Sequence, residues 1–167
     1  RPEVLSIEDR ASYPEFLPGG KAVLFSIKGF QNPDYGEIAV LSLATGKRRV
    51  VLGGGTNPRY AASGHIVFAR AGAILAAPFD LSRLEVTGPA VTLIEGIRIE
   101  EWGAAQFALS TEGTLVYVSG GPAWIGKLTS VDHQGISTMF AAAAQAYGPI
   151  SLSPDGQRLA VTVVGKT

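Results

Sequence analysis

The sequence predicts an all-β fold built from a four-stranded antiparallel unit that repeats along the chain, and two observations predict it. Four glycines recur at intervals of 44, 49 and 43 residues, at Gly20, Gly64, Gly113 and Gly156. Each lies between an alternating strand pattern and a continuous apolar run, and a second turn glycine follows in each full repeat. A period of about 40–45 residues with four strands per unit is typical of a β-propeller blade. We therefore expect a partial β-propeller.

The first hairpin of each repeat is recognised by residue types at fixed distances from its glycine. Six residues before the glycine the sequence has Pro14, Pro58, Phe107 and Ile150. Four residues before it stand Phe16, Tyr60, Leu109 and Leu152. We expect the glycine to close the turn, because it adopts positive φ at little cost. The apolar run after it, such as residues 22–25, favours a strand that is covered on both faces.

The second hairpin of each repeat is predicted around Gly46, Gly88 and Gly135, and apolar strands flank these turns. The chain then reads as one partial propeller over residues 1–167, with blades at 13–57, 58–104 and 105–148, a half blade at 149–167, and 1–12 as the outer strand of a composite blade. The four alanines at 141–144, soon followed by Gly148-Pro149, predict a linker between blades.

Several stretches resemble a known family. Residues 14–21 and 152–156 resemble the first-hairpin motif of WD-like repeats of the TolB type, and residues 38–46, 78–89 and 113–118 are similar to the propeller region of some bacterial serine/threonine protein kinases. The likeness extends over about residues 13–165. It implies a propeller fold and a periplasmic or secreted location. It transfers no catalytic residue, because the sequence has no kinase phosphate loop and no His-Arg-Asp motif.

Composition excludes several classes of function. The chain has 14 basic and 14 acidic residues, so it lacks the positive charge that general nucleic-acid binding needs. It has no cysteine, which excludes disulfides, thiolate nucleophiles and cysteine metal sites. No apolar run approaches the roughly 18 residues that suggest a membrane-spanning helix. We expect no cofactor.

Three and a half blades in an open arc would leave two apolar faces bare, and monomers seldom expose large apolar patches. Three arrangements would cover them. In the first, the chain is part of a longer propeller. In the second, two chains close one ring as a homodimer. In the third, one chain closes as a distorted four-blade ring. In the homodimer, residues 2–8 of one copy complete the half blade of the other.

Few residues suggest chemistry, and each has a plainer structural interpretation. His65 and His133 fall in turns, and the pair Glu100-Glu101 precedes Trp102 in a connection that we expect to be solvated. The glycine run 53–55 with Thr56-Asn57 has no following helix, so we expect a loop between blades and not a phosphate site. The basic cluster 47–49 fits an outer edge strand, where charge deters aggregation. Trp124, in a glycine-rich loop, either caps a blade or contacts a partner.

The function expected from these observations is that of a noncatalytic binding or scaffold module, which contacts a protein partner or another ligand. The alternatives are the propeller part of a prolyl-oligopeptidase-type hydrolase and the sensor region of a bacterial kinase. Fold resemblance supports all three in a general way, because loops at one end of a propeller carry most functions.

Overall fold

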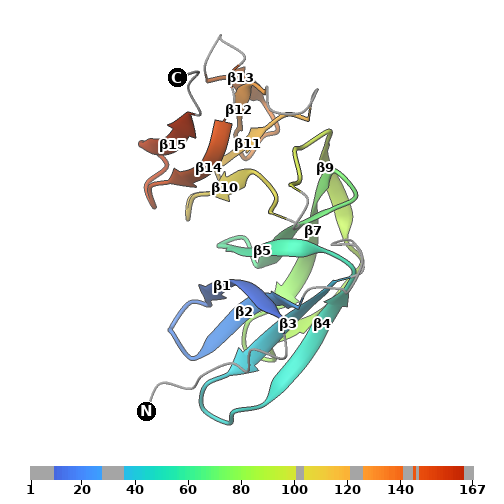
Figure 1. Ribbon diagram of the computed structural model, residues 1–167. Helices are drawn as coiled ribbons and strands as arrows, with labels where there is room; N and C mark the ends of the chain where they lie inside the picture. Colours follow the sequence, from blue (N-terminus) through green and yellow to red (C-terminus); the bar gives the residue numbers. More distant parts are fainter. Residues whose placement is uncertain are drawn as a thin grey trace.

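The computed structural model describes residues 10–27, 36–100, 104–120, 126–140, 145 and 147–163. Every regular element in these ranges is a β-strand, and the strands form antiparallel sheets that fan out along an arc (Figure 1). The predicted all-β partial propeller is confirmed. No helix among the described residues is long and apolar enough to cross a membrane.

Each sheet begins with an inner strand on the concave side of the arc and proceeds outward (Figure 1). The first sheet has the order β1 (Ala11–Phe16), β2 (Ala22–Ile27), β3 (Glu37–Ser42) and β4 (Arg48–Gly53). The second has β5 (Thr56–Ala61), β6 (His65–Arg70), β7 (Ala73–Asp80) and β8 (Glu85–Val86), with β9 (Val91–Glu95) also paired to β7. The third has β10 (Phe107–Leu109), β11 (Leu115–Val118), β12 (Leu128–Val131) and β13 (Ser137–Met139). The fourth pairs β14 (Tyr147–Leu152) with β15 (Leu159–Val163).

The four turn glycines of the repeat occupy the same turn in all four sheets. Their φ angles are +63° at Gly20, +80° at Gly64, +90° at Gly113 and +68° at Gly156. In each turn the glycine N–H donates to the carbonyl three residues earlier, at N···O distances of 2.8–3.2 Å. Because L-residues with a Cβ rarely adopt such angles, the glycine recurs at this place.

A bulge interrupts the inner strand in three of the four sheets. The strand register shifts between Ser12 and Glu15 in β1, and again after Thr56 in β5 and after Tyr147 in β14. A proline lies inside each shift, and it has no N–H to offer the neighbouring strand. The strict alternation expected for the first strand is therefore broken at this point and resumes after it.

The second turn of the second sheet differs from the prediction at Gly88. This glycine lies between β8 and β9, and the chain reverses earlier, at residues 81–84. The Asp80 carboxylate holds that reversal by accepting hydrogen bonds from the Ser82 Oγ at 2.7 Å and the Ser82 and Arg83 amides at 2.8 and 3.0 Å. The hydroxyl donor on Ser82, together with these amides, lowers the pKa of Asp80. A side-chain cap has replaced the glycine turn that we expected.

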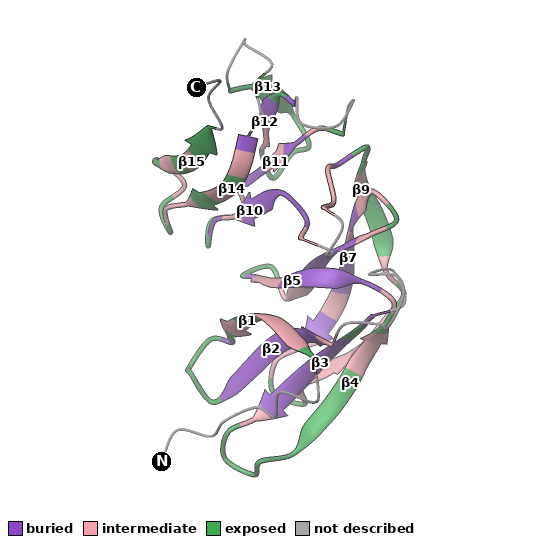
Figure 2. Cartoon of the chain, viewed as in Figure 1, coloured by how far each residue is buried: buried purple, intermediate pink, exposed green. Residues whose placement is uncertain are grey.

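Apolar clusters join each sheet to the next. Figure 2 colours β2 and β3, which contribute to the first cluster, mostly as buried. The first cluster combines Leu24, Ile38 and Val40 of the first sheet with Ile66 and Phe68 of the second. Two further clusters join the second sheet to the third and the third to the fourth. Strands β2 and β6 are buried along most of their length, as their continuous apolar sequences predict. The sheets are therefore held by mutual burial of their faces.

The ends of the arc differ from the expectation of two bare faces. On the first sheet, Val23, Phe25, Ala39 and Leu41 face away from the second sheet and are buried. On the fourth sheet, Ala160 and Thr162 are exposed, as expected, but they are small. β1 begins at Ala11, two residues before the blade boundary expected at 13. Residues 2–8 and the alanine linker at 141–144 lie outside the described residues.

Candidate functional site

Four residues at one position of the repeat meet in a single cavity. Glu15, Arg59, Ala108 and Ser151 each stand five residues before their turn glycine, on β1, β5, β10 and β14. All four line a cavity of about 270 Å³. The inner strands that carry them lie on the concave side of the arc (Figure 1). This volume is close to the lower end of the roughly 300–1,000 Å³ of small-molecule pockets. The inner strands of the sheets thus build the candidate site.

One wall of the cavity is an ion pair between two sheets. The Glu15 Oε2 accepts a hydrogen bond from the Arg59 Nη1 at 3.0 Å, and Oε1 accepts one from the Tyr60 backbone N–H at 3.0 Å. The two side chains are 25% and 34% exposed, so solvent screens the pair and it adds only about 0.2–1 kcal/mol to stability. The ion pair also gives this wall of the cavity hydrogen-bond donors and acceptors that lie side by side.

The opposite wall carries hydroxyl and aliphatic groups from the third and fourth sheets. The buried Ser110 Oγ accepts a hydrogen bond from the Thr114 amide at 3.0 Å. The Thr111 hydroxyl donates to the Pro154 carbonyl at 2.6 Å, which ties the two inner turns together. Ile150 and Leu152 add apolar surface beside them. The cavity therefore has a charged wall and a mixed wall.

The described lining of the cavity carries a carboxylate on Glu15, a guanidinium on Arg59, and hydroxyl groups that include those of Ser110, Thr111 and Ser151. In the part of the chain that the structure describes, no group of three or more His, Asp or Glu residues is placed to hold a metal ion. What the lining offers is a set of hydrogen-bond partners next to aliphatic side chains.

Neither histidine lines this cavity. The His65 Nδ1 lies 3.1 Å from the Ser63 carbonyl oxygen in the first turn of the second sheet. His133 is exposed in the β12–β13 turn. The Asp132 carboxylate caps that turn by accepting from the Ile136 and Gln134 amides, and the Ile136 amide contributes most to lowering the pKa of Asp132. His133 occupies a turn, as expected, whereas His65 follows its turn directly and is the first residue of β6.

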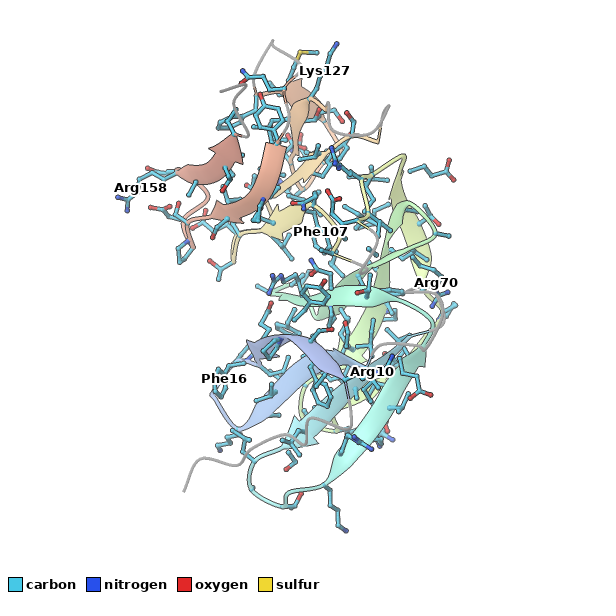
Figure 3. All side chains as sticks on the ribbon, viewed as in Figure 1. Arg10, Phe16, Arg70, Phe107, Lys127 and Arg158 are labelled. Carbon is cyan, nitrogen blue, oxygen red and sulfur yellow. The ribbon has the colours of Figure 1, made fainter. Side chains whose placement is uncertain are left out.

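The glycine run at 53–55 forms the connection between the first two sheets. The Arg70 guanidinium donates to the Gly53 and Gly54 carbonyls at 2.7–3.1 Å, and the Gly54 amide donates to Gly36. A Cβ at Gly55 would lie 2.7 Å from the Phe68 Cδ2, so this position has room only for glycine. Figure 3 shows Arg70 at this connection, away from the inner turns. The loop is an inter-sheet joint.

The remaining candidates are placed as follows. Arg49, from the basic cluster 47–49, lies on the outer strand β4, donates to the Leu84 carbonyl and lies 3.6 Å from Glu85, so it links the first two sheets at their outer edge. Glu100 accepts a hydrogen bond from Arg98 at 2.7 Å. Glu101, Trp102 and Trp124 lie outside the described residues. The predictions for those three residues stay predictions.

Sequence reasoning missed Glu15 and Arg59, although a signal was present. Opposite charges occupy the same repeat position in consecutive repeats, inside the similar segments Pro14-Glu15-Phe16 and Pro58-Arg59-Tyr60. Equivalent positions of neighbouring blades face one axis, so opposite charges there are expected to meet. The alignment of the repeats uses the positions six and four residues before each glycine, so it passes over the charged position between them.

Solved structures share this fold. Regucalcin, a calcium-binding protein from Agrobacterium tumefaciens, is similar with a TM-score of 0.62 and 17% identity over 91% of this chain and 52% of its own. A puromycin hydrolase mutant has a TM-score of 0.67 and 19% identity, over 90% of this chain and 24% of its own. The tricorn protease has a TM-score of 0.56 and 16% identity, over 95% of this chain and 15% of its own. These are proteins of the β-propeller type, so the comparisons support the propeller fold.

The chain spans about half the length of the regucalcin chain and a smaller share of the two hydrolytic proteins. At such low identity the likeness shows the fold alone. No protein-family model and no curated protein matches the sequence.

Proposed function

We propose that this chain is a noncatalytic binding module whose inner-strand cavity holds a short, extended peptide segment of a partner protein. The observation that carries the proposal is the convergence of Glu15, Arg59, Ala108 and Ser151, from four sheets, on one cavity. Propellers place such convergent positions around their central axis. A site made by several blades is held by the whole fold, which suits recognition.

The lining matches the groups of a peptide. Arg59 uses Nη1 for Glu15, and its remaining N–H groups are suited to donate to peptide carbonyls. The Glu15 carboxylate can accept from a peptide amide. Because the two charges compensate each other, the pair favours a neutral ligand with both donors and acceptors over a free anion. Ile150 and Leu152 supply apolar contact for one aliphatic side chain.

The experiment is a titration of the isotope-labelled chain with acetyl- and amide-capped pentapeptides that each carry one leucine or isoleucine, followed by NMR. We expect saturable shifts at the amides of residues 108–111 and 150–152. Arg59→Gln is expected to weaken the affinity about tenfold or more, because a hydrogen bond to a charged group is lost. Arg83→Gln is the matched control, because Arg83 is exposed in the β7–β8 turn. It is expected to change nothing.

Two outcomes would contradict the proposal. If no peptide of the set shifts these amides, or if Arg59→Gln binds as the parent does, the cavity is not the binding site. Mass spectrometry of the same mixtures provides the second check. Intact peptides agree with a noncatalytic module, whereas cleavage would favour the alternative, in which the chain is the propeller part of a hydrolase.

The finer assignment follows the sequence resemblance alone. We place the chain with the propeller regions of bacterial kinases and in the periplasm or outside the cell. The repeat motifs at 14–21, 38–46, 78–89 and 152–156 support this placement. Fractionation of cells that produce the native polypeptide tests the location, and recovery in the cytoplasm would contradict it.

A further inference from the structure

One aromatic side chain breaks a pattern that the other three sheets follow. Four residues before the turn glycine, Tyr60, Leu109 and Leu152 each pack against an apolar cluster that includes the face of the preceding sheet. Phe16 holds the same position in the first sheet and is 68% exposed. Among the large hydrophobic residues that the structure describes, none is more exposed. Figure 3 shows Phe16 at the inner edge of the first sheet.

The strand pairing supports the comparison, because all four residues pair with an apolar residue across the first hairpin. Tyr60 pairs with Ile66 and Leu109 with Leu115, whereas Leu152 pairs with Leu159 and Phe16 with Val23, so Phe16 shares the register of the fourth sheet. β5 packs against β1 and β2, and β14 packs against β10 and β11. The surface beside Phe16 therefore corresponds to the place that the first two strands of a preceding sheet occupy elsewhere in this chain.

The rest of this face limits where a partner fits. Val23, Phe25, Ala39 and Leu41 on the same face are between 0% and 9% exposed. The open part is the inner end at Phe16, next to the concave side of the arc. A partner is thus expected to reach the face through its own inner strands.

The matching surface can be described from the three joints that exist. The residue opposite the cavity position is Leu24 in the first sheet, Val67 in the second and Val116 in the third, and all three are buried against the following sheet. In the fourth sheet the equivalent residue is Ala160, which is exposed, and Thr162 beside it is exposed too. The open end of a second copy would therefore offer a small and partly polar surface, which is a poor match for Phe16.

We propose that Phe16 anchors an interface with a further propeller blade, which precedes this segment in the same polypeptide and presents an aliphatic side chain where Leu24, Val67 and Val116 stand. The interface corresponds only to the inner part of the joint between the first and second sheets, because the central strands of this face are already buried. A second copy of the chain is the rival occupant that the experiment distinguishes.

The experiment measures thiol labelling in the polypeptide as its gene encodes it. The 167 residues contain no cysteine, so a single introduced thiol reports one place. Phe16→Cys is compared with Val91→Cys, a matched control on the outer strand β9 whose parent side chain is 56% exposed. We expect Phe16→Cys to react at least about tenfold more slowly than the control, because the partner blade must open first. Equal rates, or a gene that encodes no blade-length segment before Arg1, would overturn the proposal.

The 167-residue chain alone separates the rival occupant. Here both thiols are expected to react fast at every protein concentration. Protection of Phe16→Cys that grows from low to high micromolar concentration would show that a second copy covers the face, and it would overturn the proposal. A second variant, Phe16→Ser, is expected to lower the unfolding midpoint of the complete polypeptide but not that of the 167-residue chain. The reverse result counts against the interface.

Discussion

Replacing Phe68 with alanine is expected to lower the free energy of unfolding by about 3–5 kcal/mol, the usual cost of removing a buried aromatic side chain. Phe68 is 0% exposed in the cluster between the first and second sheets. The Arg70 guanidinium lies 5.2 Å from the centre of its ring, and an exposed cation–π contact contributes about 0.5–1 kcal/mol. The backbone at Gly55 packs directly on the ring, so the resulting cavity has little freedom to collapse. The loss therefore belongs in the upper half of the range.

The assay is equilibrium unfolding in urea followed by far-ultraviolet circular dichroism. Domains of this kind have about 5–15 kcal/mol of stability, so the variant loses a large share of it. Val91→Ala is the control, because Val91 is 56% exposed and surface substitutions change stability by about 0.5 kcal/mol or less. A loss below about 1 kcal/mol for Phe68→Ala would refute the reasoning, since the two sheets would then not share a core.

Gly64→Ala is expected to lower the free energy of unfolding in urea by about 1–2 kcal/mol, because φ at Gly64 is +80°. Gly53→Ala is the control and should lower it little, because φ at Gly53 is not positive and nothing lies within 4 Å of an added Cβ. Equal losses would contradict the turn argument. Asn57 has a φ of +56°, which glycine also adopts, so Asn57→Gly removes the side-chain hydrogen bond to the Ala105 carbonyl without straining the backbone. It should lower the free energy of unfolding by about 1–2 kcal/mol, and an unchanged value would show that this bond is not formed. The lowered pKa of Asp80 stabilises the fold above about pH 4, and this contribution is lost as the pH falls through the folded-state pKa. Asp80→Asn should therefore flatten the acid side of a stability–pH curve, and an unchanged slope would contradict it.

The sequence allowed prediction of those features that depend on backbone geometry. Gly20, Gly64, Gly113 and Gly156 were found because positive φ restricts the residue type, and the structure has them in one turn. Gly88 was assigned to the wrong place because a side-chain cap at Asp80 supplies the turn there without a glycine. The spacing of glycines cannot predict a turn that a side-chain cap forms.

The candidate site was harder to predict because its residues are ordinary when taken one at a time. Glu15 and Arg59 belong to different repeats and are 44 residues apart, and they become partners only when two inner strands face a common axis. Ala108 and Ser151 have no distinctive chemistry, although they line the same cavity. The four residues share one position in the repeat, and the site is found only when that position is compared across all four repeats.

The central claim is that the sheets fan about one axis, so that inner turns converge and outer strands diverge. Spin labels on the cysteine-free chain test it directly, with one pair at Lys21 and Gln157, which follow the first and fourth turn glycines, and one at Val50 and Met139, on the outer strands β4 and β13. The account predicts a clearly shorter separation for the inner pair, as the arc in Figure 1 implies. An inner separation equal to or longer than the outer one would contradict the fan and favour sheets stacked in two layers.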